Sequence, residues 1–336
     1  MPSSCGGEIA VADPAGTEQA AFEPSAIEWQ QATCYLNGEW TALTEAKVSV
    51  LDRGFIFGDG IYEVIAVDTV DDLRAPFRAR QHFARLQRSL DMVRIDNPFS
   101  VEHWLNLIAE AIERHPWTRQ LVYVQVTRGV AKRDHPFPAG AVPTVFVNTS
   151  PWPAIPVEQI EQGVSAVTHA DERWLHCDIK STSLLGNVLM KQYAIDNGAS
   201  ETVMLRDGFL TEGSSTNVSV VKSGVISMPP QTVQILPGIT VDGIAHIAQQ
   251  HGVEVDMRPI AAAELRAADE IWLSSSGREM LAIVSLDGVG VGSGKPGPMY
   301  RSMHAWFQQA KALDAQQWAA ERAGHLSITR TTQRAA

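Results

Sequence analysis

A short proline-rich segment divides this chain and limits the folds that it can adopt. Residues 151–156 have the sequence Pro-Trp-Pro-Ala-Ile-Pro. Each proline has a fixed φ and lacks a backbone donor, so the segment is stiff and fits poorly inside a helix or a central strand. We therefore expect 151–156 to be a connector between a subdomain over residues 31–150 and another over residues 157–311.

Hydrophobic spacing predicts helices and strands on both sides of this connector. Residues 34–40 have the strand–Asn-Gly–strand pattern of a tight hairpin, whereas residues 78–93 and 104–112 place apolar residues at helical spacing. Further strands are expected at residues 62–67, 121–127, 143–147, 164–167, 202–205, 217–221, 271–273 and 281–284, and further helices at residues 188–197 and 241–250. Because the two types do not alternate strictly, an α+β pair of subdomains fits better than a doubly wound sheet.

The two ends of the chain differ in composition from the rest. Residues 1–30 are rich in Ala, Glu, Ser, Pro and Gly, and they lack the basic start and apolar stretch of a signal peptide. We interpret them as a flexible extension. Residues 312–336 are expected to form a C-terminal tail that begins as a helix and frays.

Charge and cysteine content exclude several classes of function. The formal net charge is -11 and there is no basic tract, which argues against a nucleic-acid partner. No apolar run is long enough to span a bilayer, so no membrane association is expected. The three cysteines are widely spaced and indicate neither a disulfide framework nor a metal site, which favours a cytoplasmic location.

Lys180 is the most informative single residue. Apolar and polar residues alternate over residues 173–180, which predicts a strand with this lysine at its end, before the helix that Gly198 ends. A lysine held there can be partly desolvated, which lowers the pKa of its amine and makes it nucleophilic. Most lysines are solvated instead, and this is our interpretation of the rival Lys191 in the predicted helix.

Several motifs follow one another in a fixed order around Lys180. Residues 51–64 are dense in glycine and aromatic residues, residues 211–217 have the sequence Thr-Glu-Gly-Ser-Ser-Thr-Asn, and residues 236–240 have the sequence Leu-Pro-Gly-Ile-Thr. Together they resemble the cofactor site of the class IV (fold-type IV) aminotransferases, over roughly residues 34–307. The resemblance implies a smaller N-terminal α/β subdomain, a larger C-terminal one, and pyridoxal 5'-phosphate in the cleft between them.

The resemblance assigns the ring of the cofactor to four residues. Lys180 matches the lysine that bonds covalently to the cofactor, and Glu212 matches the carboxylate that keeps the pyridine nitrogen protonated. Ser215 and Asn217 are expected to support the ring by hydrogen bonds. Without the resemblance, Glu212 would be interpreted as a surface glutamate of a hairpin.

The expected phosphate site has three parts. Ile239 and Thr240 immediately precede the helix predicted at residues 241–250, so their backbone N–H groups can point at an anion, although an ordinary turn and helix start would explain the same residues. Arg85 matches the arginine of the family's His-x-x-Arg-Leu helix, and the alternative is one more exposed helical arginine. Ser276 matches a phosphate-binding hydroxyl in relatives.

The substrate side has three candidate residues. Tyr62 matches a tyrosine that faces the substrate in the family. Arg133 and His135 share one side of an extended segment, and a guanidinium with an imidazole can receive a carboxylate, whereas solvated loop charges are the alternative. This Arg-x-His resembles the carboxylate trap of the D-amino acid aminotransferases.

That resemblance implies a ping-pong exchange of the amino group between D-amino acids, of the D-alanine and D-glutamate type, and 2-oxo acids. Family members are homodimers, so Arg133 and His135 are expected to serve the neighbouring subunit's cofactor. An (R)-selective amine transaminase, a branched-chain L-amino acid transaminase and an aminodeoxychorismate lyase remain as alternatives. A non-catalytic binding protein is also an alternative, against which the joint presence of Lys180 and Glu212 argues.

Two features depart from the family pattern. Residues 1–30 have no counterpart that we identify, and residues 277–282 replace a small-polar stretch that ends in Thr-Pro. One hypothesis is that Arg278 receives a second carboxylate of the substrate. The alternative is a solvent-facing arginine paired with Glu279.

Overall fold

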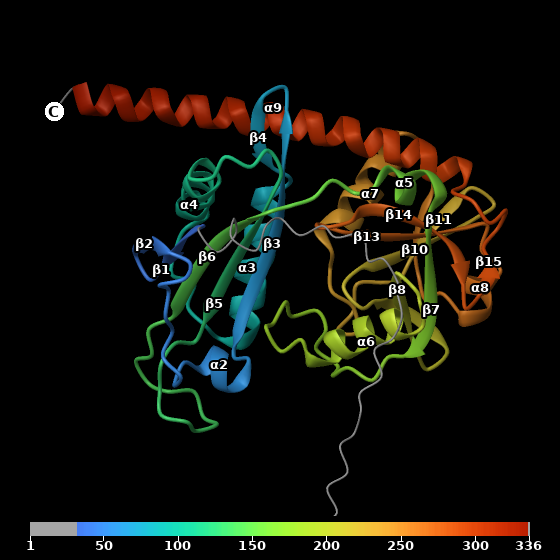
Figure 1. Ribbon diagram of the computed structural model, residues 1–336, viewed down its shortest axis with the longest axis horizontal. Helices are drawn as coiled ribbons and strands as arrows, with labels where there is room; N and C mark the ends of the chain where they lie inside the picture. The colour runs from blue at the N-terminus through green and yellow to red at the C-terminus, as the bar shows by residue number, and fades with distance from the viewer. Residues whose placement is uncertain (1–31, 335–336) are drawn as a thin grey trace, which may run out of the picture.

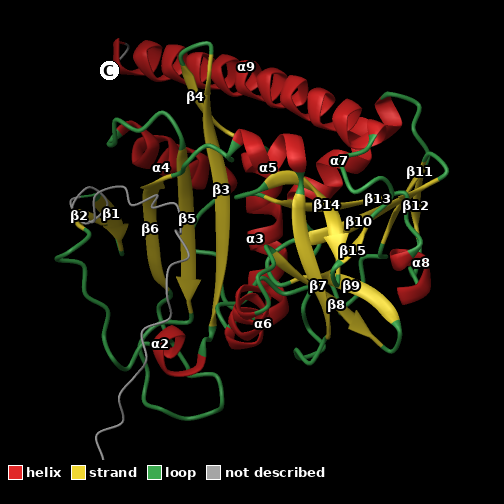
Figure 2. Cartoon of the chain, turned by 45° about the vertical axis from the view of Figure 1, so that its right-hand side comes forward, coloured by secondary structure: helices red, strands yellow, loops and turns green. Residues whose placement is uncertain are grey.

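The computed structural model describes residues 32–334, so the expected extension at residues 1–30 lies outside the described residues. Two β-sheets, each accompanied by helices, make up this part of the chain (Figures 1 and 2). Helices and strands occur in both halves, which confirms the predicted α+β class. Residues 152–156 join the two halves between the last strand of the first sheet and the first helix of the second half.

The first sheet has the strand order β2-β1-β6-β5-β3-β4, and all of its neighbouring strands are antiparallel. The strands are β1 (Thr33–Leu36), β2 (Glu39–Ala42), β3 (Gly60–Val70), β4 (Leu73–Pro76), β5 (Gln120–Thr127) and β6 (Thr144–Pro151). The predicted hairpin at Asn37 and Gly38 is confirmed, since both residues have the positive φ that a tight hairpin turn requires.

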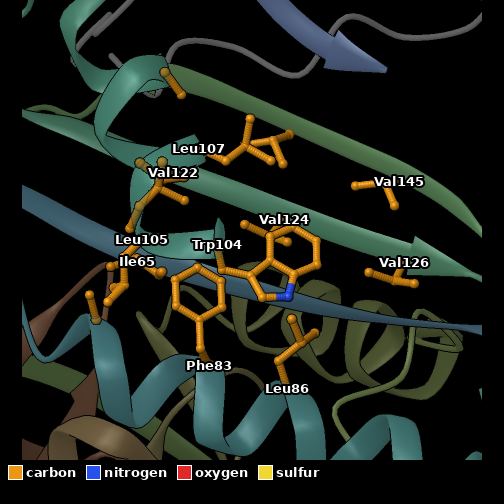
Figure 3. Close-up of a cluster of buried hydrophobic side chains, with 14 of the residues drawn as sticks. Ile65, Phe83, Leu86, Trp104, Leu105, Leu107, Val122, Val124, Val126 and Val145 are labelled. Carbon is orange, nitrogen blue, oxygen red and sulfur yellow. The ribbon is translucent and has the colours of Figure 1, made fainter. Parts of the chain in front are cut away.

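Two helices cover one face of this sheet, α3 (Ala79–Val93) and α4 (Val101–Glu113), and the short helix α2 (Arg53–Phe57) precedes β3. Phe83 and Trp104 stack with ring centroids 5.6 Å apart, and both are fully buried. Figure 3 shows these rings against valines of β5, among them Val122 and Val124. The helical spacing predicted at residues 78–93 and 104–112 thus corresponds to faces that pack on the sheet.

The second sheet is mixed and has the strand order β12-β11-β10-β13-β14-β7-β8-β9, with β15 paired to β14. The strands are β7 (Val164–Ala170), β8 (Glu201–Arg206), β9 (Phe209–Gly213), β10 (Asn217–Lys222), β11 (Val225–Met228), β12 (Val255–Met257), β13 (Glu270–Ser275), β14 (Glu279–Leu286) and β15 (Val289–Gly290). The helices of this half are α5 (Val157–Gln162), α6 (Leu185–Asp196), α7 (Ile239–Gln250) and α8 (Ala262–Arg266). Two hydrophobic clusters stabilise this half, one on each side of β13.

A long last helix, α9 (Pro298–Arg334), passes over both sheets (Figure 1). Tyr300 and Phe307 in its first half are buried in the second subdomain, whereas Trp318 packs against the core of the first. The helix predicted at the start of the C-terminal tail is confirmed. It is the continuation of α9, which runs through residue 312 without a break, and therefore links the two subdomains rather than ending at the second.

Candidate active site

A cavity of about 320 Å³ is lined by residues from both subdomains. Tyr62 of β3 contributes from the first, and the second contributes the segment before α6, one side of α6 and the turn between β9 and β10. Five of the predicted site residues line it together: Tyr62, Lys180, Glu212, Ser215 and Asn217. A volume of this size is within the usual range for small-molecule sites.

Lys180 lies in an irregular segment between β7 and α6, so the strand predicted over residues 173–180 is wrong. The backbone turns locally, because the Ile179 amide donates to His176 and the Ser181 amide donates to Ile179. In the described structure, the pairing of this irregular segment with β3 is limited to a single bridge, between Ile61 and Ser181. The alternation of residue types cannot produce a strand here because no neighbouring strand runs along the segment.

The position of Lys180 is nevertheless well defined. Its carbonyl accepts a hydrogen bond from the Tyr62 amide at 3.0 Å, and its Nζ lies 4.3 Å from the centre of the Tyr62 ring. A cation above an aromatic face is attracted by the ring quadrupole. Tyr62 is itself stacked on Tyr123, with ring centroids 5.7 Å apart. The amine is therefore held beside Tyr62, near the start of β3, and lines the cavity.

Glu212 is the last residue but one of β9 and lines the same cavity, and its side chain is buried. It accepts hydrogen bonds from Arg173 Nη1 at 2.6 Å, from the Leu236 amide at 3.1 Å and from Asn217 Nδ2 at 3.2 Å. Burial raises the pKa of Glu212 to about 7, although Arg173 opposes this increase. A carboxyl group with such a pKa can share a proton with a basic nitrogen placed beside it.

Sequence reasoning missed Arg173, the cation that holds Glu212. Its guanidinium also makes a pair of hydrogen bonds with Asp171, at 2.9 Å each, and its side chain is only 6% exposed. The signal in the sequence is weak, because Arg173 and Glu212 are 39 positions apart and meet only in the folded chain.

The turn over residues 236–240 connects the cavity to the predicted phosphate site. Leu236 lines the cavity, and Ile239 and Thr240 are the first two residues of α7, which therefore begins two residues earlier than predicted. A Cβ on Gly238 would lie 1.8 Å from Asn217 Oδ1, so only glycine fits beside Asn217. The first N–H groups of a helix have no acceptor within the helix, so the start of α7 can bind an anion.

Arg85 reaches this turn from α3. Its Nη1 donates to the Pro237 carbonyl at 2.9 Å, and its other nitrogens donate to Glu63 of β3 at 2.7 and 2.8 Å. Glu63 also contacts His82 Nδ1 at 2.7 Å, and all three side chains are buried. Arg85 is therefore not an exposed helical arginine. Sequence reasoning did not find its partner Glu63, although this residue follows Tyr62 directly.

Ser276 lies in the turn between β13 and β14. It lines a second, smaller cavity together with Thr240 and His82. Thr240 and Ser276 thus share a cavity with His82 of α3, and Arg85 of the same helix contacts the 236–240 turn at Pro237. Lys180 and Glu212 stand at the other end of the 236–240 turn, so the arrangement fits a ligand with a ring at one end and an anion at the other.

Arg133 and His135 lie outside both cavities, in the loop between β5 and β6. Both are exposed, and they flank Phe57, whose ring centre lies 5.2 Å from the Arg133 guanidinium carbon and 5.7 Å from the His135 ring centre. Arg53 fixes the loop by donating to the Asp134 carbonyl at 2.6 Å. Within one chain these two residues do not meet the other site residues.

Lys191 and Arg278 meet at the Ser200 carbonyl. Lys191 Nζ donates to it at 2.5 Å and Arg278 Nη2 at 3.1 Å. Lys191 is half-buried and lines the same cavity as Lys180 and Glu212, so the solvated position expected for it is wrong. Burial lowers the pKa of its amine. The pairing of Arg278 with Glu279 is also wrong, since Glu279 bonds to other groups, including Lys311 at 2.7 Å.

No helix in residues 32–334 combines the length and the apolar character needed to cross a membrane. In the same part of the chain, no group of three or more His, Cys, Asp or Glu side chains is arranged to hold a metal ion.

Comparison with known sequences identifies the family. The sequence profile of the amino-transferase class IV family matches residues 60–286. D-alanine aminotransferase of Staphylococcus aureus (strain MSSA476) is 40% identical over 276 residues, which cover 82% of this chain and 96% of that enzyme. D-alanine aminotransferase of Bacillus licheniformis is 38% identical over 274 residues, which cover 82% and 95%.

Comparison with solved structures indicates the same family. The branched-chain amino acid aminotransferase of Escherichia coli superposes with a TM-score of 0.80 at 27% identity, over 84% of this chain and 96% of that one. The T.th. branched-chain amino acid aminotransferase with pyridoxamine 5'-phosphate gives a TM-score of 0.78 at 26% identity, over 84% and 94%. The chain belongs to the class IV aminotransferases, which are pyridoxal-phosphate-dependent enzymes of fold type IV.

Proposed function

We propose that this enzyme is a D-amino acid transaminase, which exchanges the amino group between D-amino acids such as D-alanine and 2-oxo acids. The observation that supports the proposal is that Lys180, Glu212 and Tyr62 line one cavity. The chain that holds this cavity is 40% identical to a D-alanine aminotransferase. The identity to the branched-chain aminotransferases of similar fold is lower, at 26–27%.

The residues around the cavity fit pyridoxal 5'-phosphate. Lys180 would hold it covalently, Glu212 with Ser215 and Asn217 would hold its ring, and Arg85, Ile239, Thr240 and Ser276 would hold its phosphate. The buried carboxyl of Glu212, with a pKa near neutral, matches a basic ring nitrogen. When bound, the cofactor supplies an electron-accepting ring that stabilises negative charge at the substrate Cα.

Lys180 performs the proton transfer. Its Nζ is held at the Tyr62 ring and faces the cavity, so once free it can take the proton from the substrate Cα. Glu212, kept in place by Arg173 and Asn217, holds a proton at the ring nitrogen during this step.

We further propose that the active enzyme is a homodimer. Arg133 and His135 are exposed and lie apart from the cavity of their own chain, which suits a carboxylate receptor that completes the neighbouring subunit's site. Their loop contacts the segment before α2, where the Ala131 amide donates to the Leu51 carbonyl at 3.3 Å. Apolar side chains exposed on these two segments and on α2 include Leu51, Phe55, Val130 and Val142. A second copy would cover this apolar surface.

A donor panel tests the proposed substrate class. D-alanine, D-glutamate, L-leucine and (R)-1-phenylethylamine are each offered with 2-oxoglutarate or pyruvate as acceptor, and the 2-oxo product is measured. We expect turnover of the D-amino acids. A preference for L-leucine or for the amine would contradict the proposal and favour one of the two related transaminases. Release of pyruvate from aminodeoxychorismate without an acceptor would favour the lyase.

A matched pair of variants tests the role of Lys180. Lys180→Ala should abolish turnover, whereas Lys191→Ala removes another amine that lines the same cavity and should retain it. Borohydride reduction of the holoenzyme should fix the cofactor on the peptide that contains Lys180. Label on Lys191 would overturn the assignment.

The receptor role is tested by Arg133→Ala. It should raise KM for D-alanine much more than for (R)-1-phenylethylamine, which has no carboxylate, because losing one member of a charge pair at an interface costs about 2–5 kcal/mol. Equal losses for both donors would show that Arg133 only stabilises its loop.

A further inference from the structure

Arg78 connects three helices at the phosphate end of the site. It is the N-cap residue of α3 and has the left-handed backbone conformation, with φ of 53°. Its backbone N–H donates to Asp314 of α9 at 2.9 Å. Its guanidinium donates to the Ile239 carbonyl at 3.0 Å and to Asp242 at 2.7 Å, both in the first turn of α7. One residue therefore fixes α3, α7 and α9 to one another.

Arg78 acts on the same turn as Arg85. The two arginines are seven positions apart, Arg78 at the N-cap of α3 and Arg85 within the helix. Arg85 binds the Pro237 carbonyl and Arg78 binds the Ile239 carbonyl. The turn that begins α7 is thus held at two of its carbonyls by arginines of α3 and its N-cap, and its direction determines where the N–H groups of Ile239 and Thr240 point.

Gly243 leaves the space that this contact needs. A Cβ at this position would lie 2.7 Å from Arg78 Nη1, the atom that donates to Ile239. Glycine inside a helix is about 1 kcal/mol less favourable than alanine. Its presence in the middle of α7 is explained if the contact with Arg78 stabilises the site more than glycine weakens the helix.

We propose that Arg78 is a positioning residue that sets the direction of the first turn of α7, and so the affinity for the cofactor phosphate, without touching the cofactor. Asp314 supports it, which gives the extended α9 a part in cofactor binding. This inference depends on the proposed function, because it assumes that the start of α7 receives the phosphate.

Arg80 provides a matched control. It also belongs to α3 and pairs with α9, through Glu321 at 3.0 Å, and it pairs with Glu102 at 3.2 Å. Within the described part of the chain, its guanidinium donates to α4 and α9 and makes no hydrogen bond to α7. Arg80→Ala therefore loses ion pairs between neighbouring helices without changing the start of α7.

The experiment compares binding of pyridoxal 5'-phosphate with binding of pyridoxal, which lacks the phosphate, to the full-length chain. We expect Arg78→Ala to weaken binding of pyridoxal 5'-phosphate about five- to tenfold, as the loss of hydrogen bonds to a carbonyl and a carboxylate implies. Binding of pyridoxal should not change, and Arg80→Ala should leave both affinities unchanged. An equal loss for both ligands, or no loss for Arg78→Ala, would overturn the proposal.

A double-mutant comparison tests the mechanism. Gly243→Ala alone should weaken binding of pyridoxal 5'-phosphate to about the same degree, because it displaces the guanidinium. Added to Arg78→Ala, it should cause no further loss. Additive losses would overturn the proposed link between the two residues.

Amide hydrogen exchange over residues 239–247 separates this inference from the proposed function. Exchange should be faster in Arg78→Ala than in Arg80→Ala even without cofactor. If the wild-type chain failed to bind pyridoxal 5'-phosphate, the proposed function would be wrong, and the exchange result would still show whether Arg78 holds α7. Unchanged exchange would contradict the positioning role itself.

Discussion

Two buried glutamates, Glu63 of the first sheet and Glu212 of the second, have opposite acid–base properties. Burial favours the protonated form of Glu63, but Arg85 and His82 outweigh it and lower the pKa of Glu63 to about 2. Burial also favours the protonated form of Glu212, and here it prevails, raising the pKa to about 7 in spite of Arg173. Each glutamate faces one arginine, so the presence of a cation alone does not decide the outcome.

The difference lies in how each arginine is shared. Arg85 gives two nitrogens to Glu63, and His82 adds a third contact. Arg173 gives one nitrogen to Glu212 and two to Asp171, whose negative charge also raises the pKa of Glu212. Glu63 is therefore a permanently ionised structural group, whereas Glu212 can gain or lose a proton near neutral pH. Environments that separate two pKa values in this way are common in active sites.

The largest effect that we expect is on stability, at Glu63. Glu63→Gln leaves the buried Arg85 charge without its carboxylate, which should cost about 3–5 kcal/mol of unfolding free energy. Glu212→Gln is the matched comparison and should cost less, because Glu212 is only partly ionised and Arg173 retains Asp171. Chemical denaturation of the cofactor-free proteins at pH 7 measures both. Equal losses would contradict the distinction between the two sites.

Glu212→Gln should act mainly on catalysis. A neutral amide cannot hold a proton at the ring nitrogen. The activation free energy for turnover of D-alanine should therefore rise by about 2–4 kcal/mol, as it does when one electrostatic partner of a transition state is removed. Cofactor binding should be largely retained, since Lys180 and the phosphate site are intact. Single-turnover kinetics with bound cofactor measures the step, and a normal rate would remove the catalytic role from Glu212.

The two carboxyl groups should also respond to pH in opposite directions. The pKa of Glu212 is higher in the folded chain, at about 7, than its ordinary value of 4.5, so its stabilising contribution is complete below pH 4.5 and is lost as the pH rises to about 7. The pKa of Glu63 is lower in the folded chain, so its contribution is present above pH 4.5 and is lost as the pH falls towards 2.

Unfolding free energies of the cofactor-free wild type and Glu212→Gln, compared between pH 4.5 and 7.5, isolate the first effect. The wild type should lose stability relative to the variant as the pH rises through this range. A constant difference would mean that the pKa of Glu212 is not raised in the folded chain.

The sequence predicts local structure better than it predicts these electrostatic partners. The hairpin at Asn37 and Gly38 and the helix that carries Arg85 depend on short-range patterns, and both are confirmed. The strand predicted before Lys180 failed because a strand needs a neighbour along its length, and the alternating pattern carries no information about one. A short-range pattern can place a residue on an element without revealing what the element faces.

The same limit applies to the site. Lys180, Glu212 and Tyr62 were found through motifs, and the fold brings them to one cavity. Two residues that contact these site residues were missed because their partners are distant in sequence. Glu63 binds Arg85, 22 positions away, and Arg173 binds Glu212, 39 positions away. Such contacts depend on how the two sheets and α3 pack, which spacing along the chain does not determine.

Arg278 and Glu201 form an arginine–carboxylate pair that can be compared with Arg85–Glu63 and Arg173–Glu212. The loss of Arg278 is expected to have the smallest effect of the substitutions considered. Its Nη1 lies 3.9 Å from Glu201 Oε2, beyond hydrogen-bond distance, and its side chain is 29% exposed. Glu201 is already satisfied by nearer donors, including the amides of Thr202 at 2.9 Å and Ser214 at 3.1 Å. Arg278→Ala should therefore cost no more than about 1 kcal/mol of unfolding free energy. Since the guanidinium is directed to the Ser200 carbonyl, the ratio of kcat/KM for D-glutamate to that for D-alanine should not change. A selective loss for D-glutamate would instead show that Arg278 leaves Ser200 during turnover and binds the second carboxylate of the substrate.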